Sequence, residues 1–180
     1  FNPLSLALGA GATFVSRTLD KESKHMQDII NQSYKHRGTS FIEIYQNCNI
    51  FNDGAYSSLT DRDTKSDTVL LLEDGQPMIF GAEKNKAIRL DGNVPKVFEI
   101  GDKLTIDDAL VHDKKDYVIA SLLANMTYNP DFPEPLGVFY AINMPTYEDL
   151  MVDQIKDAIK KKPKGSVQQL LDSGDNWVVK

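Results

Sequence analysis

The sequence predicts an α/β fold in which a βαβ unit near the N-terminus is followed by a mixed α+β extension with a small antiparallel sheet. Two runs rich in β-branched and aromatic residues, 12–18 and 40–45, flank a segment with helical periodicity. Asp-Gly pairs, which are typical of tight turns, separate short apolar runs further along the chain. An amphipathic segment with clear start and stop signals lies near the C-terminus.

The βαβ unit accounts for residues 12–45. The run 12–18 is typical of a strand, and apolar residues recur at helical spacing over 21–36, with Asp20 placed to cap that helix. The run 40–45 is a second strand. A strand, a helix and a strand over about thirty residues form a crossover unit, so the two strands should be parallel with a right-handed connection.

Helix signals also occur at both ends of the chain. Asn2, followed by proline, is a typical cap for a short and largely buried helix that stops at Gly9. Thr146 is placed to cap the segment 146–162, the clearest helix in the sequence. Lysines cluster over 160–164, and they are best explained as cations that complement the macrodipole at the end of this helix.

Beyond Asn52 the sequence becomes turn-rich and acidic, with the periodicity of antiparallel strands. Asp74-Gly75 and Asp91-Gly92 each lie between two short apolar runs, so each pair predicts a hairpin. The predicted elements of this region are strands at 68–72, 78–80, 87–90 and 97–100, a helix at 117–126 and a strand at 137–141.

Composition and charge narrow the class of protein. The chain has 180 residues, of which 41% are hydrophobic and 26% charged, as in an ordinary globular protein. Its net charge of −6 argues against a nucleic-acid partner, because binding to nucleic acids depends on clustered Lys and Arg. No apolar run reaches the ~20 residues of a membrane span and no signal peptide is visible, so a cytoplasmic location is expected. A start at Phe1 suggests a piece of a longer polypeptide.

A hydrolase triad is not indicated by the histidines. His25, His36 and His112 lie in a predicted helix, at its end and in a polar loop, and none has a nucleophile motif beside it. All three are predicted to be surface residues.

Two further patterns have ordinary explanations. The acidic stretch 61–67 resembles the start of a calcium loop, but it lacks the glycine and the bidentate glutamate that such a loop requires. Gly9 and Gly11 follow a helix and precede a strand, which is the wrong order for a phosphate loop. A solvated loop and a simple turn are expected instead.

Cys48 is the only cysteine, so the chain cannot form an internal disulfide. It lies in the run EIYQNCNIFND, directly after the predicted strand 40–45, and α/β sheets place functional groups at the carboxyl ends of parallel strands. A lone cysteine is nevertheless more often a small apolar packing residue, and a metal site needs further ligands. The local pattern therefore leaves both roles open.

Several motifs in series resemble one family. They are NPLSLALGAGATFVSRT, HRGTSFIEIYQNCNIFND, TDRDT, DFPEPLGVF followed by PTYEDL, and LLDSGDNWVV. In order and spacing, over essentially the whole chain, they resemble the C-terminal half of the β subunit of 2-oxoacid:ferredoxin oxidoreductases. The form QNCNIFND is most similar to the 2-oxoglutarate type, since pyruvate-type members commonly carry Pro where this chain has Asn47.

The resemblance implies a domain organisation and a reaction. Residues 1–52 would be the C-terminal βαβ part of a thiamin diphosphate-binding domain, and residues 53–180 would be the C-terminal extension of the subunit. Subunits of this family bind thiamin diphosphate with Mg²⁺ and a [4Fe-4S] cluster. With an α subunit they decarboxylate a 2-oxoacid oxidatively, form an acyl-CoA from CoA and pass electrons to ferredoxin. No nucleic acid or membrane is implied as a partner.

The resemblance also gives Cys48 a role, because it occupies the family position of the cysteine that completes the [4Fe-4S] cluster. The Gly-Asp-Gly motif that holds magnesium and the diphosphate, and the other three cluster cysteines, do not occur in these 180 residues. A cubane cluster is normally held by four thiolates. The chain alone is therefore expected to be inactive and to hold neither cluster nor cofactor, with no catalytic or cofactor-binding residue of its own.

Two alternatives stay open. The chain could be a non-catalytic interaction module derived from this subunit, or it could serve an enzyme for pyruvate or another 2-oxoacid. The sequence is also compatible with ferredoxin or flavodoxin as the electron acceptor.

Overall fold

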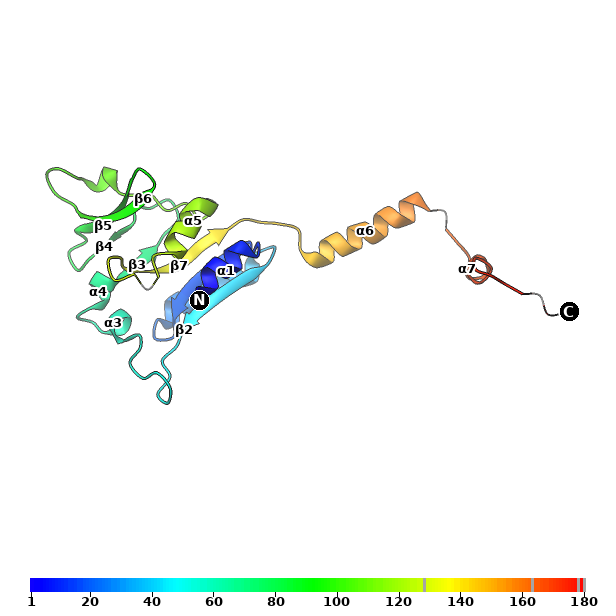
Figure 1. Ribbon diagram of the computed structural model, residues 1–180, viewed down its shortest axis with the longest axis horizontal. Coiled ribbons are helices and arrows are strands. Elements are labelled where there is room, and N and C mark those ends of the chain that lie inside the picture. The colour runs from blue at the N-terminus through cyan, green and yellow to red at the C-terminus, as the bar shows by residue number, and fades with distance from the viewer. Residues whose placement is uncertain (128, 163, 178, 180) are drawn as a thin grey trace. The chain divides into compact units, whose positions relative to one another are not determined.

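A computed structural model describes residues 1–127, 129–162, 164–177 and 179 of the chain. Its contacts divide the chain into two units, residues 1–144 and residues 145–180 (Figure 1). The first unit contains α1 (Pro3–Gly9), β1 (Phe14–Leu19), α2 (Ser23–Lys35), β2 (Ser40–Tyr45), α3 (Ser57–Thr60), α4 (Lys65–Thr68), β3 (Val69–Leu72), β4 (Ile79–Phe80), β5 (Lys86–Asp91), β6 (Val94–Glu99), η1 (Ile106–Asp108), α5 (Tyr117–Ala124) and β7 (Glu134–Ala141). The second unit contains α6 (Tyr147–Lys161) and α7 (Val167–Leu171).

The central sheet has the strand order β2-β1-β7-β3. Strands β1 and β2 are parallel, in register from Phe14 opposite Ser40 to Leu19 opposite Tyr45, and α2 connects them. Strand β7 is antiparallel to β1 and parallel to β3. The predicted α/β fold and its parallel strand pair are therefore confirmed, and Figure 1 shows β1 beside β2.

Strand β1 is buried along its whole length because helices cover both faces of the sheet. Alternate residues of a strand point to opposite faces. Val15 packs with Leu4 of α1 and Leu123 of α5, whereas Phe14 packs with Ile29 of α2. Strands with helices on both sides are usually apolar throughout, but this strand also buries Ser16, Arg17 and Thr18.

The second sheet is antiparallel, with the order β4-β5-β6. Asp91 of β5 pairs with Val94 of β6 across a two-residue turn, in which Gly92 has a φ of +62°. Glycine adopts such a φ without the steric penalty that other residues incur. The hairpin predicted at Asp91-Gly92 and the small antiparallel sheet are therefore confirmed.

The other predicted hairpin, over 68–80, is wrong. Strand β3 pairs with β7 and β4 pairs with β5, so these two strands belong to different sheets. The turn at Gly75 does form, but its backbone bonds elsewhere: the Gly75 N–H donates to the His112 carbonyl (2.8 Å), and the His112 N–H donates to the Gln76 carbonyl (2.9 Å). Leu70 of β3 is fully buried in the main core, and this burial favours pairing with β7 over a local hairpin.

Asp20 does not cap α2 as predicted. The helix begins at Ser23, and Glu22 occupies the cap position without a capping hydrogen bond from its side chain. The Asp20 carboxylate instead accepts a hydrogen bond from the backbone N–H of Asn47 (3.3 Å). The predicted cap therefore links the ends of two neighbouring strands.

Strand β7 is longer than the predicted strand 137–141, since it begins at Glu134. It lies between β1 and β3, so a strand from late in the chain completes the sheet that the βαβ unit starts. The assignment of residues 1–52 and 53–180 to two parts of a larger subunit stays a prediction.

Helix α6 is confirmed together with its predicted cap. The Asp149 N–H donates to Thr146 Oγ1 (3.2 Å), and the Thr146 N–H donates to Asp149 Oδ2 (3.1 Å), which forms a capping box. No side chain of this helix is buried in the described structure. Within the described ranges, no helix is both long enough and apolar enough to cross a membrane.

Candidate functional site

The carboxyl ends of β1 and β2 lie side by side because the two strands are parallel. The Asp20 N–H donates to the Tyr45 carbonyl (3.0 Å), and the Asp20 carboxylate accepts from the Asn47 N–H (3.3 Å). These two contacts fix the start of the loop 46–54, which carries Cys48. The predicted location of Cys48, just beyond the end of a parallel strand, is therefore correct.

Asn47 organises this loop through its side chain. Its Nδ2 donates to Asn49 Oδ1 (2.8 Å) and to Asp53 Oδ1 (2.9 Å), while its Oδ1 accepts from the Gly54 N–H (2.9 Å). Three hydrogen bonds from one amide thus join the beginning of the loop to its end. Asn47 therefore has a structural role in closing the loop.

The loop favours the thiolate form of Cys48. Hydrogen bonds from the backbone N–H groups of Phe51, Ile50 and Asn52 lower the pKa of the thiol, because they stabilise the negative charge on sulfur. The cysteine is half-buried, and it pairs with Asn52 in an isolated bridge that closes the loop further. A thiolate that accepts backbone hydrogen bonds is suited to metal ligation, to which a protonated thiol is poorly suited.

A small cavity of about 110 Å³ adjoins the loop. Its wall includes Asn47 and Tyr56, and the Tyr56 ring stacks on that of Tyr45 with centroids 4.4 Å apart. Tyr45 is the last residue of β2 and belongs to the core. Aromatic packing between Tyr56 and Tyr45 therefore connects the cavity beside the loop to the core of the sheet.

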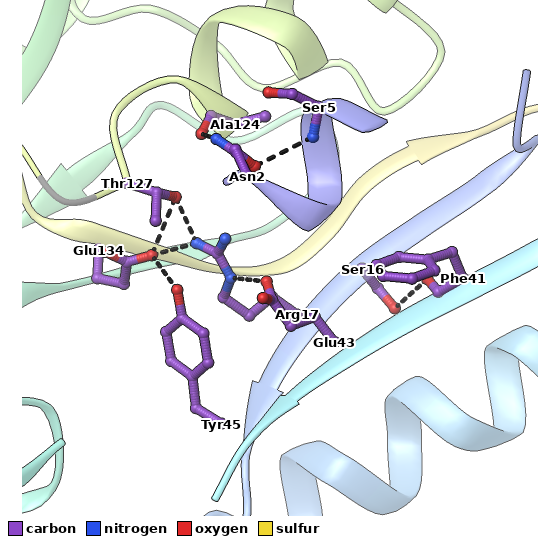
Figure 2. A network of polar contacts seen from close by, with 10 residues as sticks. All are labelled: Asn2, Ser5, Ser16, Arg17, Phe41, Glu43, Tyr45, Ala124, Thr127 and Glu134. Carbon is purple, nitrogen blue, oxygen red and sulfur yellow. Dashed lines mark hydrogen bonds and ion pairs between the residues drawn. The ribbon is translucent and has the colours of Figure 1, made fainter. Parts of the chain in front are cut away.

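A polar network that includes Tyr45 is centred on Arg17 of β1 (Figure 2). The Arg17 side chain is fully buried, and its Nε donates to Glu43 Oε2 (2.7 Å). Its Nη1 donates to Thr127 Oγ1 (2.7 Å) and forms an ion pair with Glu134. The Tyr45 hydroxyl donates to Glu134 Oε1 (3.1 Å). Four segments of the chain therefore meet at one guanidinium.

Aromatic rings enclose the same guanidinium. Arg17 Cζ lies 4.8 Å from the ring centroid of Tyr45 and 5.5 Å from that of Phe139. Guanidinium groups stack favourably on aromatic faces, and the contact strengthens where water is excluded. Nη2 has no hydrogen-bond partner among the described residues. The network positions the end of β2, and hence the loop, without touching Cys48.

The prediction that all three histidines lie at the surface is wrong for His112, of which only 1% is exposed. Its Nε2 donates to the carbonyl oxygen of Val138 (2.8 Å), and burial lowers the pKa of its imidazole. His25 and His36 are half-buried, and they contact Thr18 and Thr13 respectively. The polar loop around His112 folds back onto β7, which the local sequence did not indicate.

Cys48 is the predicted metal ligand, and the described part of the chain places no set of further ligands around it. Among the described residues, no group of three or more His, Cys, Asp or Glu side chains could hold a metal ion. In the acidic stretch, Asp67 Oδ1 forms an ion pair with Lys86 (2.8 Å). The role of Cys48 as a metal ligand therefore stays a prediction.

Comparison with known proteins defines the class. No protein-family model matches the chain. A Sulfolobus protein named 2-oxoacid:ferredoxin oxidoreductase subunit beta is 31% identical over 135 residues, which cover 72% of this chain and 43% of that protein. A solved 2-oxoglutarate:ferredoxin oxidoreductase from Magnetococcus marinus matches 98% of this chain and 45% of its own with a TM-score of 0.62, and at 18% identity it shows the fold. The chain is therefore related to the β subunits of 2-oxoacid:ferredoxin oxidoreductases.

A more particular relative supports the resemblance of the motifs to the 2-oxoglutarate type. The 2-oxoglutarate oxidoreductase subunit KorB of Mycobacterium tuberculosis is 35% identical over 183 residues, which cover 99% of this chain and 48% of that protein. The chain thus spans about half the length of the curated relatives it matches. The resemblance stated from the motifs is confirmed.

Sequence reasoning found Cys48 but missed the residues that position its loop. Asn47 was noted only as a departure from a proline, although an amide beside a strand end is a common turn former. Arg17 carried a usable signal, since a charged residue inside an apolar strand must be paired when it is buried.

Proposed function

We propose that this chain is the C-terminal part of the β subunit of a 2-oxoglutarate:ferredoxin oxidoreductase. The complete enzyme converts 2-oxoglutarate and CoA into succinyl-CoA and CO₂, and two electrons pass through an iron–sulfur cluster to ferredoxin. The observation that carries the proposal is the 35% identity to a subunit of a 2-oxoglutarate oxidoreductase over 99% of this chain. The similar fold of a solved 2-oxoglutarate:ferredoxin oxidoreductase supports it.

In this proposal Cys48 supplies one of four thiolates to a [4Fe-4S] cluster. The support is its place beyond the end of β2 and the backbone N–H groups that lower the pKa of its thiol. Asn47 holds the loop closed, so the sulfur is presented without rearrangement. The cluster, when bound, supplies one-electron transfer from the reacting centre toward ferredoxin.

Thiamin diphosphate and Mg²⁺ are assigned to the remainder of the subunit, and no residue of this chain is given a role in holding them. The α subunit, CoA and ferredoxin complete the proposed assembly, and the cytoplasm is its proposed location. The part played by this chain is to bring a thiolate to the cluster on a rigid strand end.

The ligand role is tested in the complete enzyme, purified without oxygen. Cys48→Ser should preserve assembly, because the side chain hardly changes in volume, while a hydroxyl replaces the soft thiolate at iron. Iron and sulfide content, visible absorbance and 2-oxoglutarate-dependent ferredoxin reduction should all fall. Ser58→Ala, an exposed change in nearby α3, is the matched control and should leave all of them unchanged. A fully loaded cluster with unchanged electron transfer in Cys48→Ser would show that the cysteine only packs.

The reaction itself needs a separate test. The isolated chain should neither reduce a viologen dye with a 2-oxoacid nor bind thiamin diphosphate with Mg²⁺ in a calorimeter. Co-expression with the missing part of the subunit and the α subunit should produce activity, with a larger kcat/KM for 2-oxoglutarate than for pyruvate. Turnover by the chain alone, or a preference for pyruvate, would contradict the proposal.

A further inference from the structure

Helix α6 carries an apolar face that is exposed along its whole length. The exposed fractions of Met151, Ile155 and Ile159 are 41%, 55% and 69%. At 100° per residue these side chains share one side of the helix with their apolar neighbours. An exposed apolar stripe of this kind indicates a surface that another protein surface covers. The α6 face consists of Tyr147, Met151, Val152, Ile155, Ala158 and Ile159.

Charged residues of opposite sign lie at the two ends of the α6 face. Glu148 lies seven residues before Ile155 and Lys162 lies seven residues after it, so all three fall on the same side of the helix. Lys162 keeps its helical place because its N–H still donates to the Ala158 carbonyl (3.1 Å). The face is therefore acidic at one end, apolar in the middle and basic at the other end, with Ile155 at its centre.

The flanks of the helix repeat this polarity. Glu148, Asp149 and Asp153 precede the centre and Lys156, Lys160 and Lys161 follow it, with Asp157 as the one acidic exception in the second half of the helix. A parallel partner of the same sequence would set acid against acid and base against base. An antiparallel partner would set each acidic end against a basic end and would oppose the two helix dipoles.

We propose that α6 is a self-association surface, which pairs antiparallel with α6 of a second copy of this chain across a two-fold axis near Ile155. The two Ile155 side chains meet at the axis, and Glu148 of one copy lies beside Lys162 of the other, twice. The contact is apolar at its centre and charged at its rim, as interfaces generally are. One short helix pair is a small interface, so dissociation is expected in the micromolar to millimolar range.

Sedimentation equilibrium of the full chain over a wide concentration range tests the pairing. The chain should form a concentration-dependent dimer. Ile155→Glu should weaken it by at least about tenfold in Kd, because two like charges would meet at the axis. Lys156→Gln is the control: it changes the net charge by the same amount at the flank of the helix, about 100° around the helix axis from Ile155, and should change Kd much less.

Charge reversal tests the orientation. Glu148→Lys and Lys162→Glu should each weaken the dimer, since each sets like charges side by side. The double reversal should restore it, and an equimolar mixture of the two single variants should form a mixed dimer. If the reversals acted only by destabilising the helix, the double reversal would weaken the dimer most, because both of its charges would then be unfavourable for the helix macrodipole. Far-ultraviolet circular dichroism measures the helix content of each variant independently of dimerisation.

A monomer at every concentration would overturn the proposal. So would a dimer that Ile155→Glu leaves intact, since another surface would then be responsible. Failure of the double reversal to restore a dimer that both single reversals weaken would exclude the antiparallel arrangement.

Discussion

Arg17 and Glu43, on the paired parallel strands β1 and β2, are joined by an ion pair of 2.7 Å between Nε and Oε2 in which the arginine is fully buried. Glu134 of β7 approaches the same guanidinium from the other neighbouring strand. One cation thus joins three strands of the sheet. Removal of Arg17 should be strongly destabilising, mainly because two mostly buried carboxylates would lose their counter-charge.

Arg17→Met is expected to lower the free energy of unfolding by about 3–5 kcal/mol, because it keeps the volume but leaves uncompensated buried charge. Urea denaturation followed by circular dichroism measures the loss. Arg62→Met, at an exposed arginine, is the control and should change stability by no more than about 0.5 kcal/mol. Equal stability of the two variants would show that the network contributes nothing net.

Gly137 lies where β7 passes β3, with a φ of +131°, and a Cβ there would come within 2.9 Å of the Leu72 carbonyl oxygen. Gly137→Ala should therefore cost at least about 1 kcal/mol of stability. Gly9→Ala, at a helical glycine with nothing within 4 Å of the new Cβ, should be neutral or stabilising by up to about 1 kcal/mol. Thermal melts of both variants check the sign of each change. A Gly137→Ala protein as stable as the parent would contradict the close approach.

Burial lowers the pKa of His112 below 6.5 in the folded chain, so the unfolded chain binds more protons as the pH falls below about 6.5. The stability that depends on the neutral imidazole is therefore present above about pH 6.5 and is lost below it. His112→Gln keeps a donor for the Val138 carbonyl but removes the titration. Between about pH 7.5 and 5 it should lose less stability than the parent chain.

Urea midpoints at a series of pH values measure this difference. The nearby charges of Asp74, Asp113 and Lys114 are unchanged in the variant, so their contributions largely cancel in the comparison. A pH dependence identical to that of the parent would mean that His112 does not titrate differently in the two states.

Cys48 should react with iodoacetamide at a lower pH than a cysteine in an unfolded chain, because backbone N–H groups, that of Phe51 foremost, lower the pKa of its thiol. Asn47→Ala removes the hydrogen bonds that close the loop and should move the midpoint of the pH–rate curve upward. Asn31→Ala, on the exposed side of α2, is the control and should leave the midpoint in place. If unfolding the chain in urea leaves the midpoint of the pH–rate curve unchanged, the folded loop does not lower the pKa of the thiol.

Local signals in the sequence were sufficient for the elements whose determinants lie within a few residues. Thr146 and Asp149 form the capping box of α6, and Gly92, which follows Asp91, lies in the turn between β5 and β6. The alternation of strand and helix signals over residues 12–45 predicted the parallel pairing of β1 with β2. Cys48 was placed correctly because its position depends only on where β2 ends.

The tertiary structure alone decided the features that join distant parts of the chain. Arg17 and Glu134 are 117 positions apart, and no local pattern selects one carboxylate as partner over another. His112 is polar and follows turn-rich sequence, yet β7 covers it. Strand β3 pairs with β7 and not within the predicted hairpin, because burying Leu70 in the main core outweighs the local turn preference. Burial depends on which surfaces meet, and only the folded chain brings those surfaces together.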